Sequence, residues 1–291
     1  MIPFLHIWRF TIPTFGLMVA SAMVAAYFVL RADLARRGIA AKDSGFAEAL
    51  IAIPSLAGIV GAKLYHVLEA PSVLLAQPSE LISQFGFAWF GGLIAGVAAF
   101  VLVGRRRKVP LLQILDAGSA AAALGYGVGR IGCLLSGDGD YGKPTSLPWG
   151  MSFPHGLVPT TQRVHPTPIY ELIVACLIAW ALWKLGARQV QSQTVSKTAQ
   201  RLRGIQTLPP SGSVFAAYLI LTGIARFLVE FIRINPRSFF GLTNAQAASL
   251  LSIIVGIILW IYLARLHRRS AAIPEDRPTQ RHRFEREAAK R

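Results

Sequence analysis

Seven apolar stretches constrain what this chain can fold into more than any other feature. A helix needs about 20 predominantly apolar residues to cross a bilayer core roughly 30 Å thick, and each stretch is about that long or longer. Because 53% of the residues are hydrophobic and only 15% are charged, a soluble globular protein is excluded. We therefore predict an all-α polytopic membrane protein with seven transmembrane helices. The predicted spans are residues 13–30, 46–68, 86–103, 109–135, 167–185, 213–233 and 245–264.

Basic residues gather in alternate segments between these spans. Lysine and arginine together number four in residues 31–42, four in 105–108, five in 184–203 and nine in 265–291. The positive-inside rule places such segments in the cytoplasm, so we expect the C-terminus inside the cell and the N-terminus outside. The net charge of +16 is then mainly a topology signal and a contact for anionic membrane lipids, and no nucleic-acid partner is expected.

This topology divides the chain into a membrane domain, residues 1–265, and a basic cytoplasmic tail, residues 266–291. Residues 136–166 lie outside in this topology and are polar and rich in glycine and proline. A loop of that length is usually functional in a compact protein, so we expect a small extracytoplasmic subdomain or lid there. Residues 1–12 carry aromatic and basic side chains that suit a membrane interface, and we expect no cleaved signal peptide.

The stretch of residues 125–142, GYGVGRIGCLLSGDGDYG, holds the first candidate for chemistry. Its single arginine, Arg130, falls within a predicted span, where a charge is costly and by default indicates a functional site. The alternative is that the glycines pack helices while Arg130 binds backbone carbonyls or reaches the interface. Beyond the span, Asp138 serves either a polar turn or binding and proton transfer. The two cysteines, Cys133 and Cys176, have no metal-ligand or disulfide spacing, so no metal is expected.

The predicted span 213–233 carries three charged residues at helical spacing, namely Arg226, Glu230 and Arg233. Residues three and four apart lie on one helical face, so Arg226 and Glu230 can pair. We expect this pairing to leave Arg130 and Arg233 with unmatched positive charge near the outer interface. A planar guanidinium binds phosphate through two parallel hydrogen bonds, which indicates an anion site for a lipid phosphate. The alternative is an ion-pair network that only fixes helix packing.

The segment before the fifth span places His165, Tyr170 and Glu171 at one membrane level. An aromatic belt explains Tyr170, and a carboxylate near a helix N-terminus explains Glu171. Neither explains His165, which is therefore a candidate proton acceptor. His66, near the outer end of the second span, is more simply an interfacial polar residue beside Lys63.

Four motifs lie in order along the chain: GRIG at 129–132 followed by GD at 137–138, WGMSFP at 149–154, HPTPIYE at 165–171 and RFLVEFIR at 226–233. As a set they resemble the prolipoprotein diacylglyceryl transferase family, and the resemblance covers roughly residues 10–265. It implies transfer of the diacylglyceryl group of phosphatidylglycerol to the lipobox cysteine of a prolipoprotein signal peptide, which forms a thioether and releases glycerol phosphate. It also implies a multi-pass protein of the bacterial inner membrane that uses no cofactor.

The resemblance assigns roles to individual residues. Arg130 and Arg226 resemble the two arginines that contact the lipid headgroup, and Asp138 resembles the acidic residue that ends the family signature. Charge spacing adds Arg233 to the candidates for substrate binding. The remaining candidates for substrate binding are Glu230, Gly142, Tyr170, Gly91 and Gly92.

Three residues depart from the family pattern. Phe90 stands where the family has a histidine before its paired glycines, Cys133 replaces an asparagine, and Thr222 replaces a tyrosine. Phenylalanine can neither accept a proton nor donate a hydrogen bond, so His165 is the preferred proton acceptor, ahead of Asp138, His66 and water. The alternative function is that of a catalytically altered or inactive paralogue that binds phospholipid headgroups or modifies another acceptor. A small transporter is disfavoured because no inverted repeat is visible.

Overall fold

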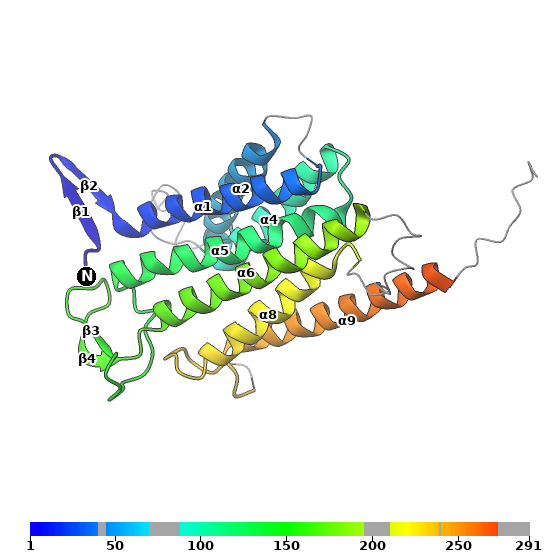
Figure 1. The fold of residues 1–291 in the computed structure, drawn as a ribbon. Helices are drawn as coiled ribbons and strands as arrows, with labels where there is room; N and C mark the ends of the chain where they lie inside the picture. The colour runs from blue at the N-terminus through cyan, green and yellow to red at the C-terminus, as the bar shows by residue number, and fades with distance from the viewer. Residues whose placement is uncertain (40–44, 70–87, 195–209, 239, 273–291) are drawn as a thin grey trace, which may run out of the picture.

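The computed structural model of the chain describes residues 1–39, 45–69, 88–194, 210–238 and 240–272. Within these ranges it contains seven α-helices and two short antiparallel β-hairpins (Figure 1). The helices are α1 (Thr14–Arg36), α2 (Phe46–Glu69), α4 (Trp89–Arg106), α5 (Leu111–Ser136), α6 (Thr167–Thr194), α8 (Ser213–Val229) and α9 (Asn244–Ala272). The first hairpin pairs β1 (Phe4–Ile7) with β2 (Phe10–Pro13), and the second pairs β3 (Met151–Phe153) with β4 (Thr160–Val164).

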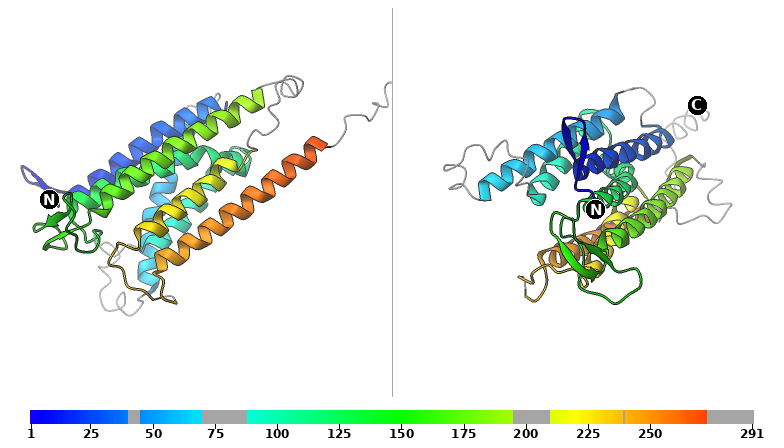
Figure 2. Two further views of the ribbon diagram at one scale, coloured as in Figure 1. Left: turned by 60° about the horizontal axis from the view of Figure 1, so that its bottom comes forward. Right: turned by 90° about the vertical axis from the view of Figure 1, so that its left-hand side faces the viewer.

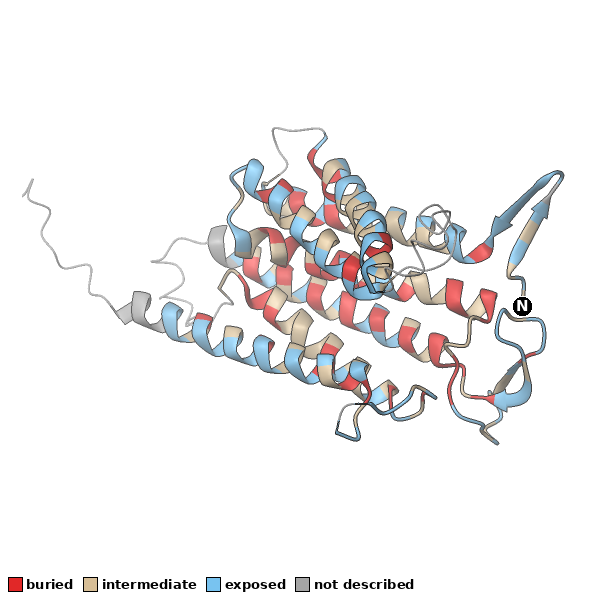
Figure 3. Ribbon diagram, turned by 180° about the vertical axis from the view of Figure 1, so that it is seen from behind, coloured by how far each residue is buried: buried red, intermediate tan, exposed pale blue. Residues whose placement is uncertain are grey.

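Six of these helices are long and apolar enough to cross a membrane, and α8 is an apolar helix of 17 residues. The outer surface of the bundle is apolar, and Trp180 and Ile258 are 63% and 62% exposed. Figure 3 shows exposed residues along much of α9, with buried residues gathered on the inner helices. A soluble protein rarely leaves so much apolar surface uncovered, whereas lipid covers it without cost. The structure therefore confirms the prediction of an all-helical, polytopic membrane protein.

Small residues bring the helices into close contact. Helix α5 packs against α1, α6 and α8 (Figures 1 and 2), and a Cβ atom at its Gly127 would lie 2.9 Å from the Cβ atom of Ala175 on α6. Helices α2 and α4 form a second pair, in which a Cβ atom at Gly91 would lie 2.3 Å from the carbonyl oxygen of Gly61. Only glycine permits these approaches, because any larger side chain would overlap the facing helix.

The two hairpins lie at one end of the bundle, beside the C-terminal end of α5 (Figure 1; Figure 2, right). Residues 1–12 were expected to be an interfacial segment, and the structure orders most of them as the β1–β2 hairpin, with Trp8 at its tip 87% exposed. The N–H of Ile2 donates to the carbonyl of Leu135 at 3.0 Å and so ties this hairpin to α5. The β3–β4 hairpin encloses a small core around Phe153.

The opposite end of the bundle holds a fully buried carboxylate, that of Asp116 on α5. It accepts hydrogen bonds from the N–H groups of Gly212 (2.7 Å) and Phe215 (2.8 Å) and from Nε2 of Gln189 (2.7 Å). The first N–H groups of a helix have no partner within that helix. Asp116 therefore supplies, from another helix, the cap that the start of α8 lacks locally.

Two helix ends differ from the predicted boundaries. Helix α8 ends at Val229, so Arg233 lies beyond the helix rather than on its face. There the chain turns, and Arg233 pairs with Gly142 in an isolated antiparallel bridge. Helix α9 continues to Ala272, so the predicted boundary at residue 265 falls within a helix, and residues 273–291 of the predicted tail lie outside the described residues.

Candidate active site

Six charged side chains, three arginines and three carboxylates, meet at the end of the bundle where the hairpins lie. They come from the last turns of α5 and α8, the start of α6, and the segments that follow α5 and α8. We call this group the arginine–carboxylate cluster. Its members are Arg130, Asp140, Glu171, Arg226, Glu230 and Arg233.

The end of α5 places Asp140 beside Arg130. The helix stops at Gly137, whose φ of 60° is left-handed, a conformation in which glycine commonly ends helices. The chain then turns through Gly139, with φ of 90°, and the N–H of Asp140 donates to Oδ1 of Asp138 at 3.2 Å. Asp138 thus stabilises the turn, while the carboxylate of Asp140 contacts Nη1 of Arg130.

Glu171 is the carboxylate that contacts all three arginines. Its Oε1 lies 2.9 Å from Nη1 of Arg226, and its Oε2 lies 3.3 Å from Nε of Arg130 and 3.4 Å from Nη1 of Arg233. The hydroxyl of Tyr126 donates to Oε1 at 2.6 Å and accepts a hydrogen bond from Nη2 of Arg130 at 2.7 Å. Glu171 therefore joins α5, α6 and the end of α8 through one side chain.

Glu230 joins two of these arginines, Arg226 and Arg233, from the side of α8. Its Oε2 lies 3.0 Å from Nη2 of Arg226 and 3.7 Å from Nε of Arg233. Its Oε1 accepts a hydrogen bond from Nδ2 of Asn235 at 2.6 Å. The pairing of Arg226 with Glu230 that the sequence predicted is confirmed.

Asp140 completes the cluster by contacting Arg130 with one oxygen and Arg233 with the other. Each arginine of the cluster thus has at least two carboxylate partners, and three positive charges face three negative ones. The prediction that Arg130 and Arg233 carry unmatched charge is wrong, because Asp140 and Glu171, distant in sequence, fold against them.

Asp138 and Asp140, which lie after the spanning part of α5, respond oppositely to their surroundings. Burial favours the neutral form of a carboxyl, but the guanidinium groups of Arg130 and Arg233 outweigh burial and hold the pKa of Asp140 below its usual range. For Asp138, burial and then the negative charge of Asp140 raise the pKa. Asp140 is therefore held ionised, whereas Asp138 binds a proton more readily than an exposed carboxyl does.

His165 and Tyr170 form a separate polar pair near the cluster. Nδ1 of His165 lies 3.3 Å from the hydroxyl of Tyr170, which also accepts a hydrogen bond from Nε1 of Trp149 at 2.7 Å. The N–H of Gly142 donates to the carbonyl of His165 at 2.8 Å. A Cβ atom at Gly142 would lie 2.6 Å from the carbonyl oxygen of Ile232, so glycine permits the chain to pass close to the end of α8.

The remaining predicted site residues lie on α4. The structure places Gly91 and Gly92 against Gly61 and Gly58 of α2, and the backbones meet there. Phe90 is 46% exposed, and its ring packs edge to face against that of Trp89, with centroids 5.4 Å apart. These residues thus shape the α2–α4 pair, and their part in substrate binding stays a prediction.

Three members of the site escaped the sequence analysis: Asp140, Glu171 as an arginine partner, and Tyr126. The dipole of its own helix is enough to account for Glu171 in the sequence, and the family resemblance points to Asp138 rather than to Asp140 in the same turn. One signal was present for Glu171, since an arginine inside a span needs a nearby anion, and a carboxylate at the start of another span can provide it.

A metal ion fits this site poorly. Cys133, Asp138 and Asp140 offer ligand atoms within 4.8 Å of one another. Yet both oxygens of Asp140 contact guanidinium groups, and Nη1 of Arg130 lies 3.5 Å from Sγ of Cys133. A divalent cation would be repelled by these two arginines.

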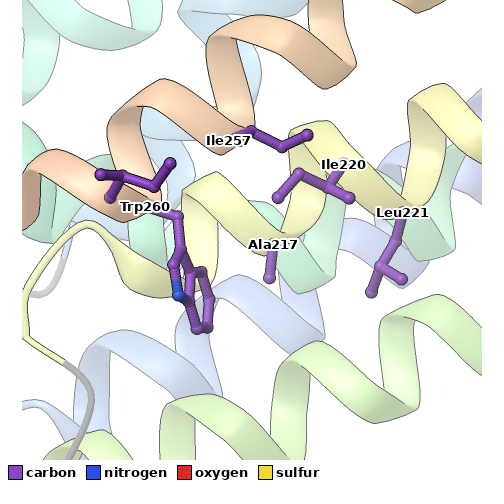
Figure 4. Close-up of a pocket in the computed structure, with 6 residues that line it drawn as sticks. Ala217, Ile220, Leu221, Ile257 and Trp260 are labelled. Carbon is purple, nitrogen blue, oxygen red and sulfur yellow. The ribbon is translucent and has the colours of Figure 1, made fainter. Parts of the chain in front are cut away.

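Two surface hollows in the described part of the chain have apolar linings and contain no member of the cluster. One, of about 380 Å³, lies at the α2–α4 pair. The other, of about 290 Å³, lies between α8 and α9 (Figure 4). Its lining residues are Ala217, Ile220, Leu221, Ile257, Trp260 and Ile261. Such apolar linings suit acyl chains.

Comparison of the sequence with known proteins identifies the family of this chain. A family model described as prolipoprotein diacylglyceryl transferase matches residues 3–262. A phosphatidylglycerol–prolipoprotein diacylglyceryl transferase of Clostridium tetani is 33% identical over 84% of this chain and 91% of its own length. Proteins of the same name from Geobacter sulfurreducens and Dehalococcoides mccartyi are 28% and 30% identical, over 86% and 89% of this chain and 90% and 92% of their own lengths. The chain therefore belongs to the prolipoprotein diacylglyceryl transferase family.

Proposed function

We propose that this protein transfers the diacylglyceryl group of phosphatidylglycerol to the lipobox cysteine of a prolipoprotein signal peptide. The sulfur attacks the glyceryl carbon that carries the phosphate, a C–S bond forms, and the C–O bond to phosphate breaks. Glycerol phosphate leaves with the electron pair of that bond, and the thiol proton passes to a base. The names of the relatives support this reaction, and the arginine–carboxylate cluster supplies the groups it needs.

The observation that carries the proposal is the convergence of three guanidinium groups at one end of a membrane bundle. Arg130 and Arg226 reach this point from different helices, and Arg233 reaches it from the turn after α8. Guanidinium groups bind phosphate oxygens in pairs and stabilise negative charge as it concentrates on the leaving phosphate. Arg130 and Arg226 take this role, Arg233 offers a third guanidinium group to the phosphate, and Glu230 holds Arg226 and Arg233 in place.

The acceptor thiol must lose its proton, because the thiolate is the nucleophile and its ordinary pKa is about 8.5. His165 serves as the proton acceptor, with Tyr170 fixing its ring through the 3.3 Å contact at Nδ1. Asp138, whose raised pKa suits proton exchange, is the second choice. Gly142 lets the backbone approach, and the Gly91–Gly92 pair on α4 borders the lipid's path.

The protein lies in the bacterial inner membrane with its N-terminus outside and its C-terminus in the cytoplasm. The hairpins and the cluster then face outward, and the segments richest in lysine and arginine, including residues 266–291, face inward. Residues 136–166 form the extracytoplasmic cover over the acceptor. Cysteine labelling with a membrane-impermeant reagent at single introduced positions in residues 1–12 and 273–291 tests this orientation.

Mass spectrometry of a lipobox peptide incubated with purified protein and phosphatidylglycerol tests the reaction. We expect a mass gain of one diacylglyceryl group with the wild-type protein and none with Arg130→Ala. Glu48→Gln, which alters an exposed carboxylate on α2 that contacts Tyr27, is the matched control and should keep full transfer. Full transfer by Arg130→Ala would refute the role of the cluster.

A second candidate function rests on Phe90, which stands where the family resemblance expects a histidine. A paralogue that binds phosphatidylglycerol without transferring it would retain the lipid through purification yet give no peptide mass gain. In that case Phe90→His is the variant to test, and a gain of transfer would identify residue 90 as the cause.

A further inference from the structure

The charges of the arginine–carboxylate cluster balance in the absence of a substrate. Its three guanidinium groups already face three carboxylates, with Glu171 within 3.4 Å of each arginine. A lipid phosphate that joined this group would add a fourth negative charge to a largely buried site, which is unfavourable. One carboxylate must therefore withdraw before a phosphate can contact the arginines.

The three carboxylates differ in how readily they can withdraw. The side chains of Glu230 and Glu171 are 0% and 5% exposed, whereas that of Asp140 is 30% exposed. Glu230 and Glu171 also accept hydrogen bonds from neutral donors, namely Asn235 and Tyr126, which hold them when the arginines are engaged elsewhere. The side-chain donors that contact the carboxylate of Asp140 are the guanidinium groups of Arg130 and Arg233.

The position of Asp140 resembles that of a bound anion. One of its oxygens contacts Arg130 and the other contacts Arg233, so two oxygens of one negative group bridge two guanidinium groups. A phosphate bridges a pair of arginines in the same way, with two of its oxygens. Carboxylate and phosphate would therefore compete for the same donors.

The backbone at Asp140 is held while its side chain can turn. The hydroxyl of Thr167 donates to the carbonyl of Asp140, and the N–H of Asp140 donates to Asp138 at 3.2 Å. An aspartate side chain rotates about two bonds, so it can leave the arginines without movement of the loop.

Building on the proposed function, we propose that the carboxylate of Asp140 occupies the position of the substrate phosphate and is displaced from Arg130 and Arg233 when the lipid headgroup binds. In the free protein Asp140 keeps both guanidinium groups paired and ordered, which avoids uncompensated buried charge. The observed affinity for an anionic lipid is reduced by the fraction of molecules in which Asp140 still holds the arginines.

The test compares the dissociation constant for short-chain phosphatidylglycerol between detergent-purified wild-type protein and Asp140→Asn. Asparagine has nearly the same shape but no charge, so it competes weakly for the arginines. We expect the variant to bind phosphatidylglycerol about tenfold more tightly, and to bind free glycerol phosphate more tightly as well.

In the transfer assay KM for the lipid should fall without a rise in kcat. Glu48→Gln removes one negative charge away from the cluster and should leave both dissociation constants unchanged.

Glu171→Gln provides the contrast within the cluster. Glu171 positions all three guanidinium groups at 2.9 to 3.4 Å, so its replacement should displace the arginines and weaken binding of phosphatidylglycerol. If Asp140→Asn does not fold, Asp140→Ser, which is smaller and also neutral, takes its place in the comparison.

The outcomes separate this proposal from the proposed function. A dissociation constant for Asp140→Asn that equals or exceeds the wild-type value overturns the displacement of Asp140, even if the wild-type protein transfers diacylglyceryl groups. Tighter binding by Asp140→Asn, in a protein that gives no transfer at all, supports the displacement and overturns the transferase function.

Discussion

Replacing Glu171 with glutamine removes the one carboxylate that contacts all three arginines while keeping its size. The side chain is buried and lies at 2.9 to 3.4 Å from three guanidinium groups, so the substitution leaves positive charge that Asp140 and Glu230 alone must balance. Removing one partner of a buried ion pair costs about 3–5 kcal/mol. Glutamine can still accept the hydrogen bond from Tyr126, so we take the lower end, about 3 kcal/mol.

This cost translates into a measurable change in thermal stability. For a chain of this size each kcal/mol shifts Tm by about 2–4 °C, so Glu171→Gln should lower Tm by about 6–12 °C. The assay is the fraction of fluorescently tagged protein that stays monodisperse after heating in detergent. Glu48→Gln alters an exposed carboxylate that accepts a hydrogen bond from the hydroxyl of Tyr27; it is the control and should leave Tm unchanged within error.

A double substitution sharpens the reasoning. Arg226→Gln removes the partner that lies 2.9 Å from Glu171, so the two substitutions together should cost less than the sum of their separate costs. If Glu171→Gln shifts Tm no more than the control, or if the two costs simply add, the cluster does not hold α5, α6 and α8 together.

Three further predictions follow from the geometry. Arg130→Lys keeps the positive charge but should lower kcat/KM for diacylglyceryl transfer to the peptide by about 100-fold or more. Three separate nitrogens of Arg130 contact neighbouring side chains, and a single ammonium group cannot make all three contacts. Near-normal transfer by Arg130→Lys would contradict this. Gly91→Ala should lower Tm, because the new Cβ atom would overlap Gly61 at a cost of about 1–3 kcal/mol. Gly16→Ala is the control and should not lower Tm, because a Cβ atom there would meet no atom within 4 Å. Equal Tm values for the two variants would argue against close packing of α2 on α4. Because the pKa of Asp140 is lower in the folded protein, the stability that its ionised carboxylate contributes is complete above the unfolded pKa of about 3.9 and is lost as the pH falls through the folded pKa. At pH values below about 4 the Tm of the wild-type protein should therefore fall, and the Tm of Asp140→Asn should fall less. Identical profiles of Tm against pH for the two proteins would refute this.

The membrane architecture could be predicted because apolar length is a local property of the sequence. Each predicted span coincides with one helix, since about 20 apolar residues leave few alternatives in lipid. The β1–β2 hairpin was not predicted, because residues 1–12 alternate too weakly to distinguish a strand from an interfacial helix. The end of α8 was placed four residues late, since the apolar pattern continues beyond the last helical hydrogen bond.

The candidate site was predictable only where a single residue conflicted with its surroundings. Arg130 and Arg226 stand out because a charge within an apolar span demands an explanation. Glu171 did not stand out, because its own helix dipole accounts for it and nothing in the sequence shows that three arginines converge on it. The choice between Asp138 and Asp140 depends on the left-handed backbone of Gly139, which only the folded turn reveals.

The buried carboxylate at the other end of α5 bears on how the protein is made. Helix α5 carries Asp116 near one end and Arg130 near the other. Translocon-based scales assign about 2.5–3.5 kcal/mol to a charge at the centre of a lone span, which is the upper bound for these two residues. Partners of both residues on other helices, namely Gly212, Phe215 and Glu171, lie in segments that the ribosome synthesises later. Helix α5 is thus poorly suited to partition alone into lipid, and it should remain at the insertion machinery until α6 and α8 arrive. A chain truncated before residue 210 would leave Asp116 without its two backbone donors, and we expect the quality-control proteases of the membrane to remove it.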